Sequence, residues 1–130
     1  MTTDTSAVDR IGAGKYALIT TYRRNGTPVA TPVWVVRDGD ALAAWTPTDS
    51  GKVKRIRRDP RVTVAPCTIR GEQTGPAAPG RAELMDAGGT DRVRQLIRRK
   101  YPVTGPLTVM MSRWRRGKAG TIGVRLTLDR

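Results

Sequence analysis

Strands dominate the pattern of apolar and polar positions along the chain. Residues 15–22 (KYALITTY) and 28–36 (PVATPVWVV) are rich in β-branched and aromatic residues, which predicts two strands. Asn25-Gly26 between them predicts a tight hairpin turn with both central residues at positive φ. A turn at 38–40 leads into a third strand over 41–46 (ALAAWT), so this part of the chain is predicted to form a three-stranded meander.

The hydrophobic period changes after the meander. Val53 and Ile56 stand three residues apart in the segment SGKVKRIRR, a spacing that predicts a short helix over 50–58. Asp49 or Ser50 is the expected N-cap, because either side chain can accept a hydrogen bond from a free N–H of the first turn. The Asp-Pro pair that follows ends the helix.

The other elements complete a mainly β (α+β) pattern. A longer helix is predicted over 91–101, with Thr90 as its cap. Residues 1–14 predict a short helix or an arm, the first ten being a flexible arm. The remaining strands are predicted at four places: 61–69, 80–85, 107–111 and 121–128. About seven short strands joined by short connections predict a small antiparallel β-barrel, because closure removes exposed sheet edges.

Two prolines fall inside predicted strands, at Pro32 and Pro66. Proline has no N–H to donate to a strand ladder, so each position predicts a sheet edge or a bulge. At Pro32 we therefore expect one side of the backbone to be free to face a ligand.

Length and composition limit the possible functions. The chain has 130 residues, which we interpret as a single domain over 1–130. Histidine is absent and Cys67 is the only cysteine, which excludes histidine-based nucleophile pairs, an intrachain disulfide and a cysteine-based zinc site. We expect Cys67 to be a buried structural thiol and expect no metal site. The N-terminal sequence has no signal-peptide pattern and no segment is apolar enough for a membrane span, so a cytoplasmic location is expected.

A strong positive charge points to anionic partners. Twenty-four Lys and Arg residues against 11 Asp and Glu give a formal net charge of +13. Such a field favours nucleic acid, phosphorylated ligands or polycarboxylates, and its alternative is a merely solvated basic surface. Aromatic residues make up only 5% of the chain, too few for the stacking platforms that bind single strands, so nucleic acid is not the expected partner.

The densest basic segment coincides with a helix start. In residues 45–55 (WTPTDSGKVKR) a strand ends, a turn follows and the helix opens near Ser50. Lys52, Lys54 and Arg55 would then lie near the helix N-terminus, where the helix dipole makes cations unfavourable and anions favourable. The segment therefore predicts an anion site, with a solvated basic helix as the alternative. In the absence of ligand we expect Lys52 to face solvent.

The segments KYALITTYRRNGTPVATPVW, AAWTPTDSGKVKRIRRDPRVTVAPC, RGEQTGPAAPGRAEL and RVRQLIRRKY together resemble a known family. They are similar to the pyridoxamine-phosphate-oxidase-like split β-barrel proteins, and most similar to the actinobacterial flavin/deazaflavin oxidoreductases that use coenzyme F420. The resemblance runs over about residues 10–101. It implies a split antiparallel β-barrel with two or three short helices, and a homodimer with the cofactor in a groove between subunits.

The resemblance also implies which residues bind the cofactor. Its phosphate end would be held by Ser50, Lys52 and Lys54, with Arg55 near its acidic tail. Three strand residues would lie along the ring, namely Thr31, Pro32 and Val33, and two more would border the ring or its linker, namely Trp45 and Thr46. Trp34 and Trp45 also fit plain core or dimer-interface positions.

The function that the resemblance implies is a reductase that transfers a hydride from reduced F420 to an electron-poor organic acceptor. The cofactor carries the hydride, so the absence of histidine is no obstacle, and no catalytic side chain is predicted. The high positive charge fits F420, which bears a phosphodiester and a polyglutamate tail. The alternatives are an FMN-binding oxidoreductase of the same fold and a non-catalytic binder of a cofactor or another anion.

Overall fold

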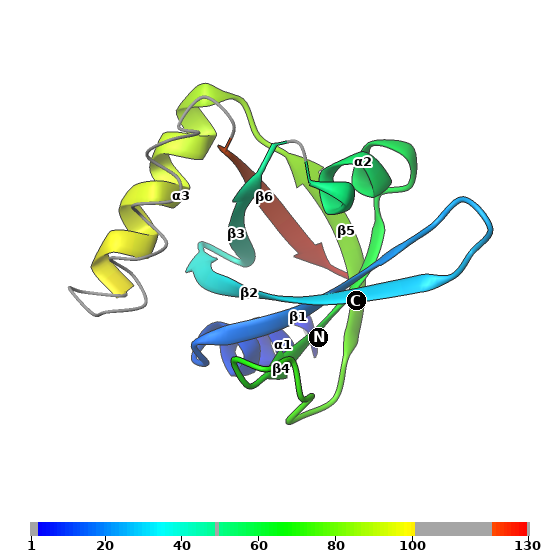
Figure 1. Ribbon diagram of the computed structural model, residues 1–130. Helices are drawn as coiled ribbons and strands as arrows, with labels where there is room; N and C mark the ends of the chain where they lie inside the picture. The colour runs from blue at the N-terminus through cyan, green and yellow to red at the C-terminus, as the bar shows by residue number, and fades with distance from the viewer. Residues whose placement is uncertain (1–2, 49, 101–120, 130) are drawn as a thin grey trace.

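Six strands form the frame of the molecule. The computed structural model describes residues 3–48, 50–100 and 121–129, shown as ribbons in Figure 1. The elements follow in the order α1 (Thr3–Gly12), β1 (Tyr16–Tyr22), β2 (Pro28–Asp38), β3 (Ala41–Pro47), α2 (Gly51–Arg58), β4 (Arg61–Cys67), β5 (Ala78–Leu84), α3 (Ala87–Lys100) and β6 (Thr121–Leu128). The strands close into an antiparallel barrel in the order β1-β2-β3-β6-β5-β4, which confirms the mainly β barrel. The strand expected at 107–111 lies outside the described residues.

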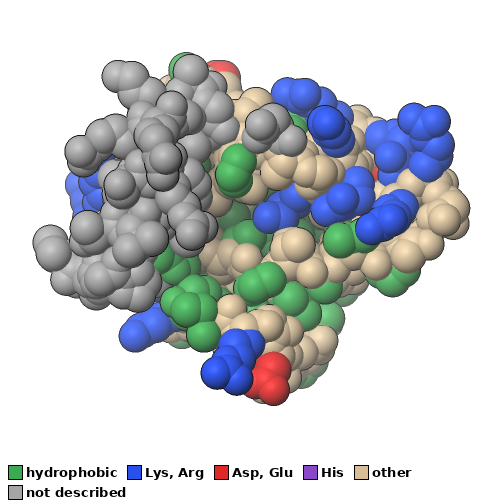
Figure 2. Space-filling model, in the orientation of Figure 1, with side chains coloured by type: hydrophobic (Ala, Val, Ile, Leu, Met, Phe, Trp, Pro, Cys, Tyr) green, Lys and Arg blue, Asp and Glu red, His purple; other side chains and the backbone are tan. Residues whose placement is uncertain are grey.

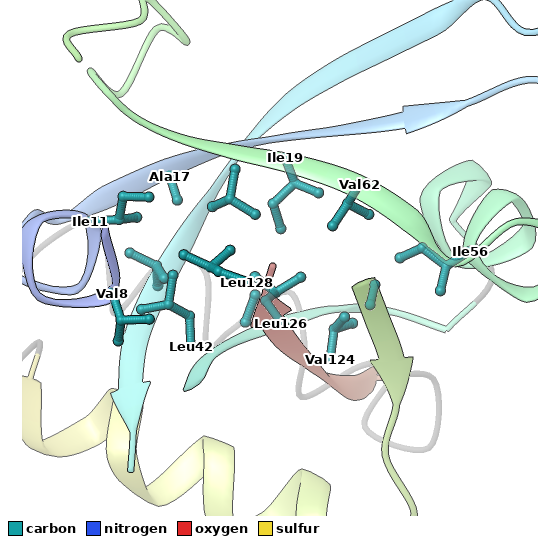
Figure 3. Packing of buried hydrophobic residues seen from close by; sticks show 14 residues of the cluster. Val8, Ile11, Ala17, Ile19, Leu42, Ile56, Val62, Val124, Leu126 and Leu128 are labelled. Carbon is teal, nitrogen blue, oxygen red and sulfur yellow. The ribbon is translucent and has the colours of Figure 1, made fainter. Parts of the chain in front are cut away.

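The core runs along the barrel from one helix to another. Val8 and Ile11 of α1 lie at one end of a row of buried apolar side chains, and Ile56 of α2 lies at the other (Figure 3). Leu126 and other strand residues fill the space between them. The segment expected to be a flexible arm is thus helical from Thr3 onward, because Val8 and Ile11 share one helix face and bury it in the barrel.

The β1–β2 hairpin turns through a longer loop than expected. Gly26 has a φ of 89°, and no non-glycine residue in the described ranges has a positive φ, so the prediction for Asn25 is wrong. The Gly26 N–H donates to the Arg23 carbonyl over 2.8 Å, and the Asn25 side chain accepts from the Thr27 N–H over 3.0 Å. Only the glycine enters the left-handed region, because the Asn25 side chain stabilises the turn instead.

The third helix begins earlier than its apolar spacing predicted. Asp86 Oδ1 accepts from the Gly89 N–H over 2.8 Å, which places the cap before Ala87. Thr90 is therefore not the cap but a buried residue inside α3, where its Oγ1 accepts from the Gly123 N–H over 3.0 Å. This bond fastens α3 to β6, so the threonine serves tertiary packing rather than helix initiation.

The two strand prolines differ in how their strands are paired. β1 pairs with β2 over Pro28–Trp34, whereas β3 pairs only with Val35–Asp38. Within the described residues the first half of β2, including Pro32, therefore pairs on one side only, as predicted. β5 pairs with Arg61–Val64 of β4 and stops short of Pro66, but there the Thr74 N–H donates to the Pro66 carbonyl over 2.9 Å and Cys67 forms a bridge with Gln73. The open edge expected at Pro66 is therefore not found, because the chain that follows β4 folds back onto it. The open half of β2 belongs to the same hairpin that runs beside α2.

Candidate anion-binding site

The first turn of α2 is built as the sequence predicted. Ser50 is the N-cap in an extended conformation, and its Oγ accepts from the Val53 N–H over 3.3 Å. Val53 and Ile56 are buried, so the helix is anchored through its apolar face. The first turn carries no acidic residue that would offset the positive end of the helix dipole. An anion at this position would meet favourable electrostatics.

Lys52 is held against the barrel rather than extended into solvent. Its side chain is half-buried, and Nζ lies 3.4 Å from the Thr46 hydroxyl, to which it donates. Burial and the neighbouring Arg55 charge lower the pKa of Lys52 to about 8. The expectation of a solvent-facing lysine is therefore wrong, because Thr46 at the end of β3 offers a hydroxyl that draws the ammonium inward.

Arg55 lies back over the start of its own helix. Its Nε donates to Thr21 Oγ1 over 2.7 Å, and a Cβ built on Gly51 would stand only 2.8 Å from Nη1. Burial, followed by the charges of Arg23 and Arg58, lowers the pKa of Arg55. The guanidinium thus lies above the first turn in the company of further cations.

Four cations make up what we call the α2 cation cluster: Arg23, Lys52, Arg55 and Arg58. Arg58 donates to the Tyr22 carbonyl, which ties α2 to the hairpin. Figure 2 shows Lys and Arg side chains gathered over α2 and the adjoining hairpin on the viewed face. Among the described residues, no carboxylate forms an ion pair with any member of the cluster. The pKa of Asp59 is lowered mainly by its hydrogen bonds to Arg61 and further by the Arg58 charge, so Arg58 is partly offset. The positive charge of the other members is suited to an anionic ligand.

The open half of β2 adds a second feature that suits a ligand. The Thr31 hydroxyl is buried without a hydrogen-bond partner, and buried polar atoms of this kind are rare in folded proteins. Thr31 and Val33 share one face of β2, while Pro32 points to the other and is exposed. A ligand along this edge could therefore satisfy the hydroxyl of Thr31.

The structure separates the predicted site residues into two groups. Thr46, Ser50, Lys52 and Arg55 come together around the start of α2. Trp45 instead packs beneath α3 together with Trp34, and the Arg94 guanidinium lies 5.3 Å from its ring centroid. Because neighbouring strand residues point to opposite faces, Trp45 cannot share a face with Thr46.

Lys54 adds positive charge to α2, but no polar contact within the described residues positions its side chain. It is exposed on α2, and its side chain forms no hydrogen bond or ion pair within the described residues.

Two residues of the site were not predicted from the sequence, namely Thr21 and Arg23. The alternation of β1 puts Thr21 on the inward face, and that alternation was the available signal. Its contact with Arg55, 34 positions away, had no signal in the sequence.

The described residues offer little for acid–base or metal chemistry. Cys67 is half-buried rather than buried, and desolvation raises its pKa, which disfavours the reactive thiolate. No group of three or more potential ligands among the described His, Cys, Asp and Glu residues could hold a metal ion. None of the helices in these ranges has the length and apolar content that a membrane crossing requires. The arrangement can bind and orient an anionic molecule.

Similarity to known proteins agrees with this architecture. A family model described as pyridoxamine 5′-phosphate oxidase matches residues 5–113. No curated protein matches the chain. A solved conserved hypothetical protein from Mycobacterium tuberculosis superimposes with a TM-score of 0.71 at 21% identity, covering 96% of this chain and 79% of that one.

Two further solved structures carry names that refer to cofactors. One described as an F420 reductase has a TM-score of 0.62 at 19% identity and covers 94% of this chain and 93% of its own. An FAD-binding protein from Mesorhizobium loti also has a TM-score of 0.62, at 15% identity, covering 94% and 85%. At these identities the similarity shows a shared fold.

Proposed function

The chain belongs to the pyridoxamine 5′-phosphate oxidase family, and we propose that it is a coenzyme F420-dependent reductase that transfers a hydride to an electron-poor small organic acceptor. The observation that carries this proposal is the α2 cation cluster, four cations without a carboxylate partner among the described residues. One structural neighbour is named an F420 reductase, which supports the same choice.

The residues present fit an elongated anionic cofactor. When bound, F420 supplies the hydride, and its phosphodiester and acidic tail supply several negative charges. Ser50 and the free N–H groups at the start of α2 would hold the phosphodiester, and Lys52 and Arg55 would donate charge-assisted hydrogen bonds to it. The ring would extend along Thr31–Val33, where the unpartnered Thr31 hydroxyl would find a partner.

FMN is the main alternative cofactor. A structural neighbour named as an FAD-binding protein shows that a flavin is compatible with this fold. FMN has a single phosphate, which would engage fewer members of the α2 cation cluster than F420 does. We therefore expect F420 to bind more tightly than FMN at matched salt. If the protein binds a cofactor but has no reductase activity, it would be a cofactor carrier.

We also propose that the protein is a cytoplasmic homodimer. A second subunit would cover the open edge of β2 and so complete a groove for the cofactor. The open edge of β2 needs a cover, and apolar groups lie next to it. A Cβ on Gly71 would stand 3.7 Å from both Leu18 and Pro32, and nearby Ile69 is 61% exposed. Light scattering should give about twice the chain mass of 14.2 kDa. A monomer at micromolar concentration would contradict this arrangement.

Fluorescence titration with both cofactors, followed by an acceptor screen with reduced F420, tests the proposal. We expect saturable F420 binding, a weaker response to FMN, and oxidation of reduced F420 that depends on an added electron-poor acceptor. Equal or reversed affinities would contradict the F420 assignment. Binding without turnover across the screen would favour a carrier.

A further inference from the structure

The guanidinium of Arg55 is fixed by a neutral group rather than by a carboxylate. Nε donates to the Thr21 hydroxyl over 2.7 Å, and the two residues are 34 positions apart in the sequence. Thr21 is only 1% exposed, so its hydroxyl lies in a low-dielectric environment where a hydrogen bond is strong and well defined. The bond uses the inner nitrogen of the guanidinium and leaves the two terminal nitrogens for other partners.

The guanidinium also lies close to the backbone of its own helix at Gly51. A Cβ on Gly51 would stand 2.8 Å from Nη1 and 3.6 Å from Cζ of Arg55. Any larger residue at position 51 would push the guanidinium away from the first turn. The bond to Thr21 and the close approach to Gly51 together define the position of Arg55.

This position is electrostatically unfavourable in the absence of a ligand. Arg23 and Arg58 both oppose the charge on Arg55, and the positive end of the helix dipole lies beneath it. An aspartate at position 21 would hold Arg55 equally well but would neutralise it. A threonine holds the side chain and preserves its charge.

Resting on the proposed function, we propose that Thr21 is a positioning residue that, with Gly51, holds the Arg55 guanidinium over the start of α2 so that its terminal nitrogens bind the phosphate group of the ligand. Thr21 does not contact the ligand. Its contribution to affinity passes through Arg55.

The test uses inorganic pyrophosphate as the probe, measured by calorimetry on the full chain at fixed salt. Thr21→Val keeps the shape of the side chain and removes the acceptor, and should weaken binding about tenfold. Thr21→Ser restores the hydroxyl and should bind within about twofold of wild type. Thr20→Val, on the adjacent residue of β1 facing the opposite side, is the matched control and should leave binding unchanged.

A double-mutant cycle separates positioning from direct contact. Substitutions at residues that act through one another have non-additive effects on binding. Thr21→Val should therefore cause no further loss of affinity in an Arg55→Ala background. The NMR signal of the Arg55 Nε–H should exchange slowly with solvent in the unliganded wild type and rapidly in Thr21→Val. Melting temperature should fall by no more than about 3 °C in Thr21→Val, which separates the effect from a loss of folding.

The outcomes distinguish this inference from the proposed function. Equal losses from Thr21→Val with and without Arg55 would overturn the positioning role, as would unchanged affinity in Thr21→Val or a wild type that fails to bind pyrophosphate. A wild type that binds pyrophosphate through Thr21 and Arg55, but binds neither F420 nor FMN, would overturn the proposed function and support the positioning role.

Discussion

The two basic helices α2 and α3 use the same residue types in opposite ways. On the α3 side, Asp38 is only 7% exposed and pairs with Arg92 over 3.0 Å and with Arg125 over 3.6 Å. The Lys100 ammonium donates to the carbonyls of Gly12, Gly14 and Val35 over 2.6–2.8 Å. At α2, Lys52, Arg55 and Arg58 donate hydrogen bonds to two hydroxyls and a carbonyl.

The comparison shows how a structural cation differs from a binding cation. Two α3 cations, Arg92 and Arg94, are offset by carboxylates, and a third, Lys100, fastens α3 to three carbonyls. Lys52 and Arg55 of α2 are likewise held by neutral acceptors, but further cations act on them, so this concentrated charge is available to a ligand. A net charge of +13 does not reveal this division, because both helices contribute to it in the same way. Four experiments test this division between the two helices.

The largest expected effect is on the α3 side. Lys100→Met should lower the free energy of unfolding by about 3 kcal/mol, because three carbonyls lose a charged donor. Urea unfolding measures the change, and exposed Arg99→Ala should shift it by less than about 0.5 kcal/mol. Cofactor affinity should stay at the wild-type value in the folded protein. A marked loss of affinity in Lys100→Met would contradict the division between the two helices.

Lys52→Ala should weaken F420 binding about tenfold to a hundredfold, since one charge-assisted hydrogen bond contributes roughly 1.5–3 kcal/mol. Arg99→Ala, the same change of charge on α3, is the matched control. If binding were mere attraction to net charge, both variants would weaken it alike and salt would abolish both effects. We expect the Lys52→Ala effect to persist at about 0.5 M salt in fluorescence titration, and the Arg99→Ala effect to vanish.

Burial of the Lys52 charge should also lower the free energy of unfolding of the wild-type protein. Because burial lowers the pKa of Lys52 from 10.5 to about 8, the unfolded state binds more protons between these values, and wild-type stability rises with pH in that window. Lys52→Met removes the buried charge and should raise the free energy of unfolding by about 1–2 kcal/mol at pH 7. The gain should shrink as the pH approaches 10.5. A destabilised variant at pH 7 would mean that the Thr46 contact outweighs burial.

The smallest effect concerns the pH dependence of binding. An anion favours charged Lys52, so above a pKa of about 8 the free protein must take up a proton to bind. Between pH 7 and pH 8.5 we expect affinity for F420 to fall about fourfold in wild type. Lys52→Met should be nearly flat over this range. A pH-dependent Lys52→Met variant would assign the titration to another group.

Local signals were sufficient for most of the elements. β-branched and aromatic residues predicted β1 and β2, alternation predicted β6, and the pair Asp49-Ser50 before the basic helix predicted a cap that the structure assigns to Ser50. These features depend on residues close together in the sequence, where period and capping chemistry dominate. Pro32 marked a strand edge for the same reason, since a missing N–H is a property of the residue itself.

Tertiary structure decided what each of these residues does. Thr90 has a good capping side chain, yet α3 starts earlier and the hydroxyl binds the Gly123 N–H, 33 positions away. Lys52 is drawn inward by Thr46, and Arg55 is held by Thr21 of a strand far back in the sequence. The order of residues alone places the cations on α2 and α3 and decides which faces of the strands are apolar. Whether a cation meets a carboxylate or a hydroxyl was settled only by the closure of the barrel, because that closure brings distant elements within hydrogen-bond distance and removes them from water.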